Sequence, residues 1–149
     1  MNMKTSLLTL AGVLCAGLLT ACAADAHKHL ATPKGGKLLD KTEPHAEFVV
    51  EKDRSVTINF YDEKMKPVAA TTQTVTVIAD AKTGKATLEF EKKGDTLVSK
   101  SKLPEGDGYN VVVQFKAKPD AKVQNLRFKL DMHICGECKR AEYACSCGH

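Results

Sequence analysis

The chain has 149 residues, of which 22 are basic and 18 acidic, so its formal net charge is +4 with neutral histidines. This length suffices for one domain with a hydrophobic core. So small a basic excess excludes the clustered Lys/Arg pattern of nucleic-acid-binding proteins, and no nucleic-acid partner is expected. The sequence also lacks the motifs of serine hydrolases, zinc proteases and phosphate-binding loops, so we do not expect an enzyme.

Residues 1–21 have the pattern of a cleavable signal peptide. Lys4 gives a short positive start, and no charged residue occurs between positions 7 and 20. This apolar run is shorter than the about 20 residues that a membrane-spanning helix needs. The segment is therefore expected to be an export signal and not a permanent membrane anchor.

The end of this signal, Leu19-Thr20-Ala21-Cys22, resembles the lipobox of bacterial lipoproteins. The resemblance implies cleavage before Cys22 and attachment of a lipid such as palmitate to its thiol. The lipid would hold the mature protein at a membrane of the cell envelope. In such lipoproteins, an Asp after the lipidated cysteine tends to retain the protein at the inner membrane. This chain has Ala23 there, which favours the outer membrane over the periplasm-facing leaflet of the inner membrane. The alternative is an ordinary secretory signal that leaves a soluble protein.

Residues 22–44 are expected to form a lipidated N-terminus and a tether. The segment is rich in small and polar residues, is interrupted by Pro33, Gly35 and Gly36, and has no periodic apolar pattern. His27 and His29 lie in it and could offer imidazoles to a metal ion. A solvated linker is the favoured interpretation, because a flexible segment loses conformational entropy when it binds.

Residues 45–132 are expected to form an antiparallel β-sandwich of the immunoglobulin-like kind. Apolar residues recur with a period of two in several short runs, and turn residues such as Lys82-Thr83-Gly84 and Lys93-Gly94-Asp95 separate these runs. The runs lie at residues 48–50, 56–60, 74–78, 86–90, 111–115 and 126–130. Their spacing predicts an all-β domain of seven or eight strands, with an up-and-down barrel as the alternative.

The first part of this domain carries a second resemblance. Gly35-Gly36, a His-x-Glu at His45–Glu47, Tyr61-Asp62 and Lys66-Pro67 together resemble a small periplasmic β-domain that accompanies heavy-metal-handling proteins, including copper and zinc efflux adaptors. That family often has His before the Gly-Gly, where this chain has Lys34. The resemblance implies a metal-efflux or other envelope protein as partner. The alternative is a shared use of turn and strand residues.

Residues 133–149 form a tail in which metal-ligating residues are concentrated. Four cysteines in the order Cys-x-x-Cys and Cys-x-Cys lie between two histidines, and the candidate ligands are Cys135, Cys138, Cys145, Cys147, His133 and His149. A Cys-x-x-Cys turn directs two thiolates at one ion, and Gly136 gives that turn backbone freedom. Cys-x-Cys places two sulfurs on one side of an extended segment.

These ligands predict a site for a thiophilic transition metal, either zinc or copper, with four sulfurs or with three sulfurs and one nitrogen. The leading alternative is a tail closed by two disulfides, because thiols outside the cytoplasm tend to be oxidised. A redox-active Cys-x-x-Cys is a third option, although the chain lacks the strand–helix setting that lowers the pKa of such thiols.

The sequence therefore predicts a lipid-anchored envelope protein that binds or passes on a transition metal through its C-terminal cluster. The alternative function is a structural or interaction module whose tail is closed by disulfides. The cluster can face away from the membrane only if the two ends of the sandwich lie at opposite poles.

Overall fold

The structure is a computed structural model, and it describes residues 31–147. The expected signal peptide, the lipobox with Cys22, the histidines of the tether and His149 lie outside the described residues. Within residues 31–147, no helix is long and apolar enough to cross a bilayer.

The described chain is all-β and antiparallel, with nine strands and one short 3₁₀ helix. The elements are β1 (Lys37–Leu39), β2 (His45–Val50), β3 (Val56–Tyr61), β4 (Pro67–Val68), β5 (Thr74–Ala81), β6 (Gly84–Lys93), β7 (Thr96–Ser99), β8 (Tyr109–Lys116), β9 (Gln124–Leu130) and η1 (Glu142–Ala144). The strands follow the spatial order β1-β2-β3-β7-β6-β5-β8-β9, and β4 pairs with β3.

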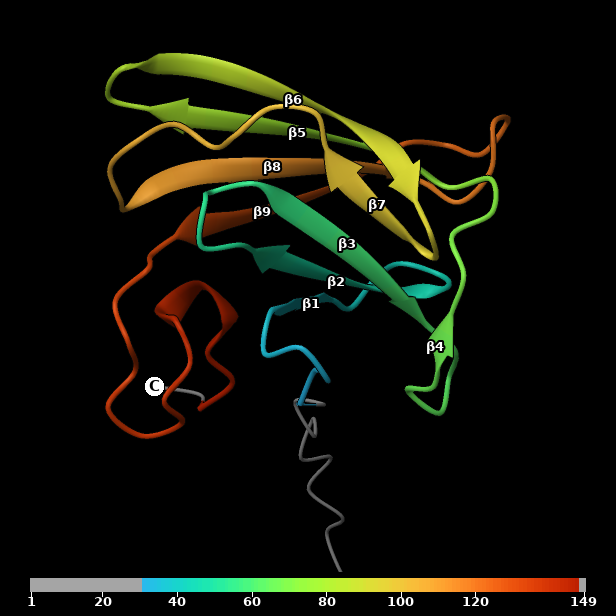
Figure 1. Cartoon of the computed structure of the whole chain (residues 1–149), viewed down its shortest axis with the longest axis horizontal. Coiled ribbons are helices and arrows are strands. Elements are labelled where there is room, and N and C mark those ends of the chain that lie inside the picture. Colours follow the sequence, from blue (N-terminus) through green and yellow to red (C-terminus); the bar gives the residue numbers. More distant parts are fainter. Residues whose placement is uncertain (1–30, 148–149) are drawn as a thin grey trace, which may run out of the picture.

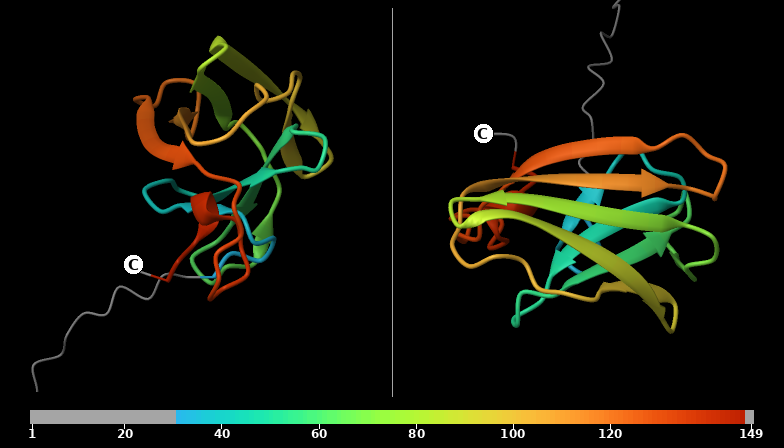
Figure 2. Two further views of the ribbon diagram at one scale, coloured as in Figure 1. Left: turned by 90° about the vertical axis from the view of Figure 1, so that its left-hand side faces the viewer. Right: turned by 90° about the horizontal axis from the view of Figure 1, so that it is seen from above.

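The long strand β6 joins two layers of this sheet. Its residues 84–89 pair with β5, whereas residues 90–93 pair with β7. One layer therefore contains β1, β2, β3 and β7, and the other contains β5, β8 and β9. Figure 1 shows β5, β6, β8 and β9 above β1, β2 and β3, with β7 linking the two sets, and the view from above in Figure 2 shows the strands of the two layers crossing.

The turns that connect the strands use the residues that the sequence analysis identified. Two residues, Lys82 and Thr83, join β5 to β6, and Gly84 closes the hairpin with a φ of +123°. Gly94 and Asp95 join β6 to β7, and Gly94 has a φ of +59°. In both hairpins the positive φ falls on a glycine, which adopts it without a steric penalty.

Alternating side chains from both layers meet in one core. In β8, for example, Val111, Val113 and Phe115 are fully buried, while their neighbours along the strand are more exposed. Phe115 meets Phe60 of β3 from the opposite layer, with ring centroids 6.4 Å apart. Phe48 of β2 meets Phe128 of β9 edge to face at 5.2 Å. These contacts bury apolar surface on the inner face of each layer, as in a β-sandwich.

The predicted fold class is confirmed, while the strand count and one boundary differ. The structure has nine strands and not seven or eight, because β1 and β4 are two or three residues long and carry too few residues for a detectable alternation. The segment expected to be a tether up to residue 44 contains β1, which pairs with β2 from Lys37↔Phe48 to Leu39↔Ala46. Leu39 is buried, and the folded part therefore begins before residue 45.

Candidate metal centre

The tail leaves the sandwich at the end of β9 and turns back on itself. Ile134 and Ala141 form an isolated antiparallel bridge. Inside it, the Cys135 amide donates to the Arg140 carbonyl at 2.7 Å and the Lys139 amide donates to the Cys135 carbonyl at 3.1 Å. Lys139 adopts a φ of +59°, which completes this tight loop. The loop brings Cys135 and Cys138 to the same side.

The second half of the tail returns the other two cysteines to the first pair. The helix η1 ends at Ala144 and is capped by Cys145, whose amide donates to the Glu142 carbonyl at 3.1 Å. The chain then becomes extended, with a Cys145 ψ of +139°. Cys145 and Cys147 are thus two residues apart on an extended segment, and the Cys147 amide lies 3.4 Å from the Cys145 sulfur.

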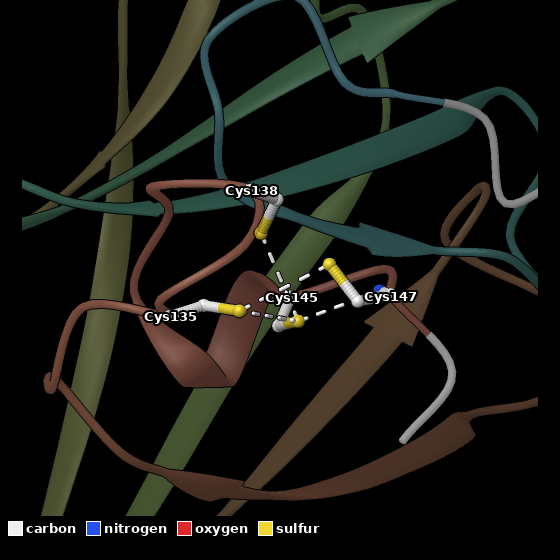
Figure 3. A group of neighbouring side chains, drawn as sticks. All are labelled: Cys135, Cys138, Cys145 and Cys147. Carbon is white, nitrogen blue, oxygen red and sulfur yellow. Dashed lines mark hydrogen bonds between the residues drawn. The ribbon is translucent and has the colours of Figure 1, made fainter.

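The four sulfurs converge on one point (Figure 3). The Sγ atom of Cys145 lies 3.5 Å from that of Cys135 and 3.8 Å from that of Cys138. The Sγ atoms of Cys135 and Cys147 are 3.9 Å apart. All four sulfurs lie within 4.8 Å of one another. The cysteines of the tail therefore form one cluster that is close enough to hold a metal ion.

The cluster lies at the rim of the fold. Cys135 is 1% exposed, whereas Cys138, Cys145 and Cys147 are half-buried. A hydrogen bond from the Arg140 amide lowers the pKa of the Cys138 thiol to about 7. The Cys138 thiolate, together with desolvation, raises the pKa of Cys147 above its usual range. Ionisation of the Cys138 thiol is thus favoured over ionisation of Cys145 and Cys147, whose pKa values are raised.

Tyr143 attaches the tail to the sandwich. Its ring is 6% exposed and lies between Phe48 of β2, at 6.1 Å, and Phe128 of β9, at 6.3 Å. Its hydroxyl accepts a hydrogen bond from the Val50 amide at 3.1 Å, and its own amide donates to the Asp131 carbonyl at 2.9 Å. The sequence analysis missed this residue, because a single tyrosine among polar neighbours has no periodic signal.

His133 belongs to a different group of side chains. Its Nδ1 atom lies 2.8 Å from a carboxylate oxygen of Asp131 and 3.4 Å from one of Asp107, and its side chain is 80% exposed. The hydrogen bond to Asp131 raises the pKa of His133. The two compact groups of metal-ligating atoms in residues 31–147 are the four cysteines and this Asp107–Asp131–His133 group. The structure therefore assembles the four predicted thiols, while it places His133 with carboxylates.

The residues of the metal-handling resemblance form a hydrogen-bonded corner next to the tail. Glu47 is fully buried and accepts hydrogen bonds from the Gly36 amide at 2.7 Å and the Tyr61 hydroxyl at 2.6 Å. A Cβ on Gly36 would lie 2.4 Å from the Phe48 carbonyl oxygen, so only glycine fits there. The spacing of Gly36, Glu47 and Tyr61 thus has a structural reason that the sequence alone did not reveal.

This corner places the start of the described chain beside the cluster. Thr32 donates to the Gly36 carbonyl, and the Arg140 guanidinium lies 3.5 Å from both the hydroxyl and the carbonyl of Thr32. The left view of Figure 2 shows the red tail next to the blue start of the ribbon. The start of the described chain and the cysteine tail therefore lie at the same pole of the sandwich. The sequence analysis required opposite poles for a cluster that faces away from an N-terminal anchor, and this requirement is not met.

Comparison with protein-family models, with curated proteins and with solved structures found no significant match to this chain. The geometry and chemistry of the thiol cluster are therefore the basis for proposing a function.

Proposed function

We propose that the chain binds one Zn²⁺ ion through the thiolates of Cys135, Cys138, Cys145 and Cys147. The observation that carries this proposal is the set of sulfur–sulfur distances of 3.5, 3.8 and 3.9 Å. Four sulfurs placed tetrahedrally at about 2.3 Å from a zinc ion are about 3.8 Å apart. The cluster already has this size, so zinc binding requires little rearrangement.

The same distances favour a metal over two disulfides. Cys145 lies 3.5 Å from Cys135 and 3.8 Å from Cys138, while Cys147 lies 3.9 Å from Cys135. No pair is set apart from the others, whereas two disulfides require two separate pairs, each with sulfurs about 2.05 Å apart. Tetrahedral four-sulfur sites are typical of zinc or iron–sulfur chemistry, and copper(I) is the other thiophilic ion such thiolates accept.

For the protein as a whole, we propose a lipoprotein of the cell envelope that binds zinc or passes it on at the membrane surface. The Leu19-Thr20-Ala21-Cys22 sequence supports the anchor. Contact between Arg140 and Thr32 supports a cluster close to that anchor. Three half-buried ligands support exchange with an envelope protein partner, such as an efflux component, because a partner can reach them.

The test is a combined measurement of metal content and thiol state. We expect the full-length product, purified in detergent without oxygen, to contain about one zinc per chain, with all four tail cysteines reduced. The double change Cys138→Ser and Cys145→Ser should abolish zinc binding. Ser146→Ala, between two ligands, should preserve it.

Two results would overturn the proposal. One is a tail peptide without zinc whose mass is lower by four hydrogens, which is the signature of two disulfides. The other is stoichiometric copper that excess zinc does not displace. A lipid-modified N-terminal peptide in the mass spectrum tests the anchor separately.

A further inference from the structure

We infer that the metal centre controls whether Tyr143 is docked in the opening between β2 and β9, so that metal loss uncovers the aromatic end of the core. This inference rests on the proposed zinc site and concerns what that site regulates. Tyr143 lies in η1, between Cys138 and Cys145 in the chain. Any ion that joins these two cysteines therefore closes a loop around Tyr143.

The opening that Tyr143 fills results from the strand pairing. β1 pairs with β2 only as far as Lys37↔Phe48, and β2 continues to Val50. Beyond Phe48, no strand of residues 31–147 lies beside this edge of β2, and the Val50 amide donates instead to the Tyr143 hydroxyl at 3.1 Å. The tyrosine thus supplies the acceptor that the missing part of β1 would have supplied.

The ring of Tyr143 covers the aromatic end of the core. It packs edge to face on Phe48 and is stacked on Phe128, and these two rings belong to opposite layers. Phe48 is fully buried, and Phe128 is half-buried even with the tail in place. Removal of Tyr143 therefore exposes rings from both layers, together with the Val50 amide.

The tail holds this position with backbone hydrogen bonds, most of them within the tail itself, and with little buried side-chain surface. Tyr143, Ala144 and Cys135 are its buried residues. Ordering a segment of this length costs more conformational entropy than the burial of one aromatic side chain and two small ones returns. A metal ion that binds only the folded arrangement supplies the difference.

Hydrogen exchange measured by mass spectrometry tests the inference on the full-length product in detergent. With zinc bound, peptides covering the end of β2 and η1 should exchange slowly. After zinc removal under reducing conditions, they should exchange at least about tenfold faster, while β5 and β8 keep their protection. The central strands serve as the internal control for an intact sandwich.

Tyr143→Ala tests the coupling in the other direction. All four ligands remain, so the variant should still bind one zinc per chain, but the end of β2 should exchange fast with and without zinc. Because coupling between two sites is reciprocal, its zinc affinity should fall by about tenfold. Tyr143→Phe keeps the ring and removes the acceptor of the Val50 amide, so only protection at that amide should decrease.

The outcomes separate this inference from the proposed function. Stoichiometric zinc with identical exchange at the end of β2 in the two states overturns the inference alone. The same holds if Tyr143→Ala binds zinc as tightly as the unchanged protein. Failure to bind zinc at all overturns both.

Discussion

The sandwich and the tail are ordered by different means, although they belong to one chain and touch each other. The sandwich has continuous antiparallel ladders and a core of fully buried residues such as Val77, Val111 and Phe115. The tail has one isolated bridge, one short 3₁₀ helix and four converging thiols. The sandwich is held by apolar burial and backbone hydrogen bonds, whereas under the proposed function a bound ion holds the shape of the tail.

On the proposal of a metal centre in the tail, this small protein places that centre at its edge without using the metal to fold the sandwich. Tyr143 is the main contact between the two regions, and it lies on Phe48 and Phe128 at one end of the core. Loss of the metal should therefore disturb one end of the sandwich and leave the central strands intact.

Acidification should have the largest effect, and it should act on the tail. A cysteine thiol must lose its proton before it binds zinc. The hydrogen bond from the Arg140 amide lowers the pKa of Cys138 to about 7, whereas the pKa values of Cys145 and Cys147 are raised. Below pH 7, protons compete with zinc at these three sulfurs, so zinc affinity should fall by at least about three powers of ten per pH unit, or about 4 kcal/mol.

Competition with a chromophoric chelator between pH 6 and 7 measures this slope. The far-UV circular dichroism of the sandwich should stay constant over the same range. A slope near one proton per zinc would show that most of the thiols are not ligands.

Phe48→Ala should have the next largest effect, and it should act on the sandwich. Phe48 is fully buried in β2 and touches both Phe128 and Tyr143. Truncation leaves a cavity and should lower the free energy of unfolding by about 3–5 kcal/mol. Urea denaturation with and without zinc measures this loss, and Val123→Ala on the surface provides the control. A loss below about 1 kcal/mol would mean that the Phe48 site collapses without a cavity.

The sequence predicted the sandwich well because the pattern of each strand is local. In the run Val111, Val113 and Phe115, every second residue is apolar, and the structure buries these three more deeply than the residues between them. β7 contains the alternating pair Leu97 and Ser99 but is only four residues long, and β1 and β4 are shorter still. Such short strands are recognised only through their partners, which a local pattern does not contain.

For the tail, spacing identified the four thiols but not the fate of the histidines. Cys-x-x-Cys and Cys-x-Cys each fix the relative direction of two sulfurs, and the structure brings the two pairs together. His133 has a similar place in the sequence, yet it lies against Asp131 and Asp107, and Asp107 comes from the loop before β8. A contact between residues so distant in the sequence depends on the tertiary fold, as does the burial of Glu47 beside Gly36 and Tyr61.

Glu47→Gln tests the corner that joins the two regions. The Glu47 carboxylate accepts hydrogen bonds from the Gly36 amide and the Tyr61 hydroxyl, and it is fully buried. A glutamine turns an amide donor toward these groups, so the free energy of unfolding should fall by about 1–3 kcal/mol. Tyr61→Phe removes one of the donors and should cost about 1 kcal/mol. A Glu47→Gln variant as stable as the unchanged protein at neutral pH would contradict the assigned role of the carboxylate.

Lys100→Ala should have the smallest effect, because it removes an ion pair that neither region depends on. Lys100 Nζ lies 3.2 Å from a Glu89 oxygen, and the two side chains are 51% and 72% exposed. Water and salt screen such a pair, so its removal should change the free energy of unfolding by less than about 0.5 kcal/mol and leave zinc affinity unchanged. Urea denaturation at low and high salt measures the difference. A loss above about 1 kcal/mol that disappears in high salt would show that surface charge, and not apolar burial, supports the β5–β6–β7 part of the sandwich.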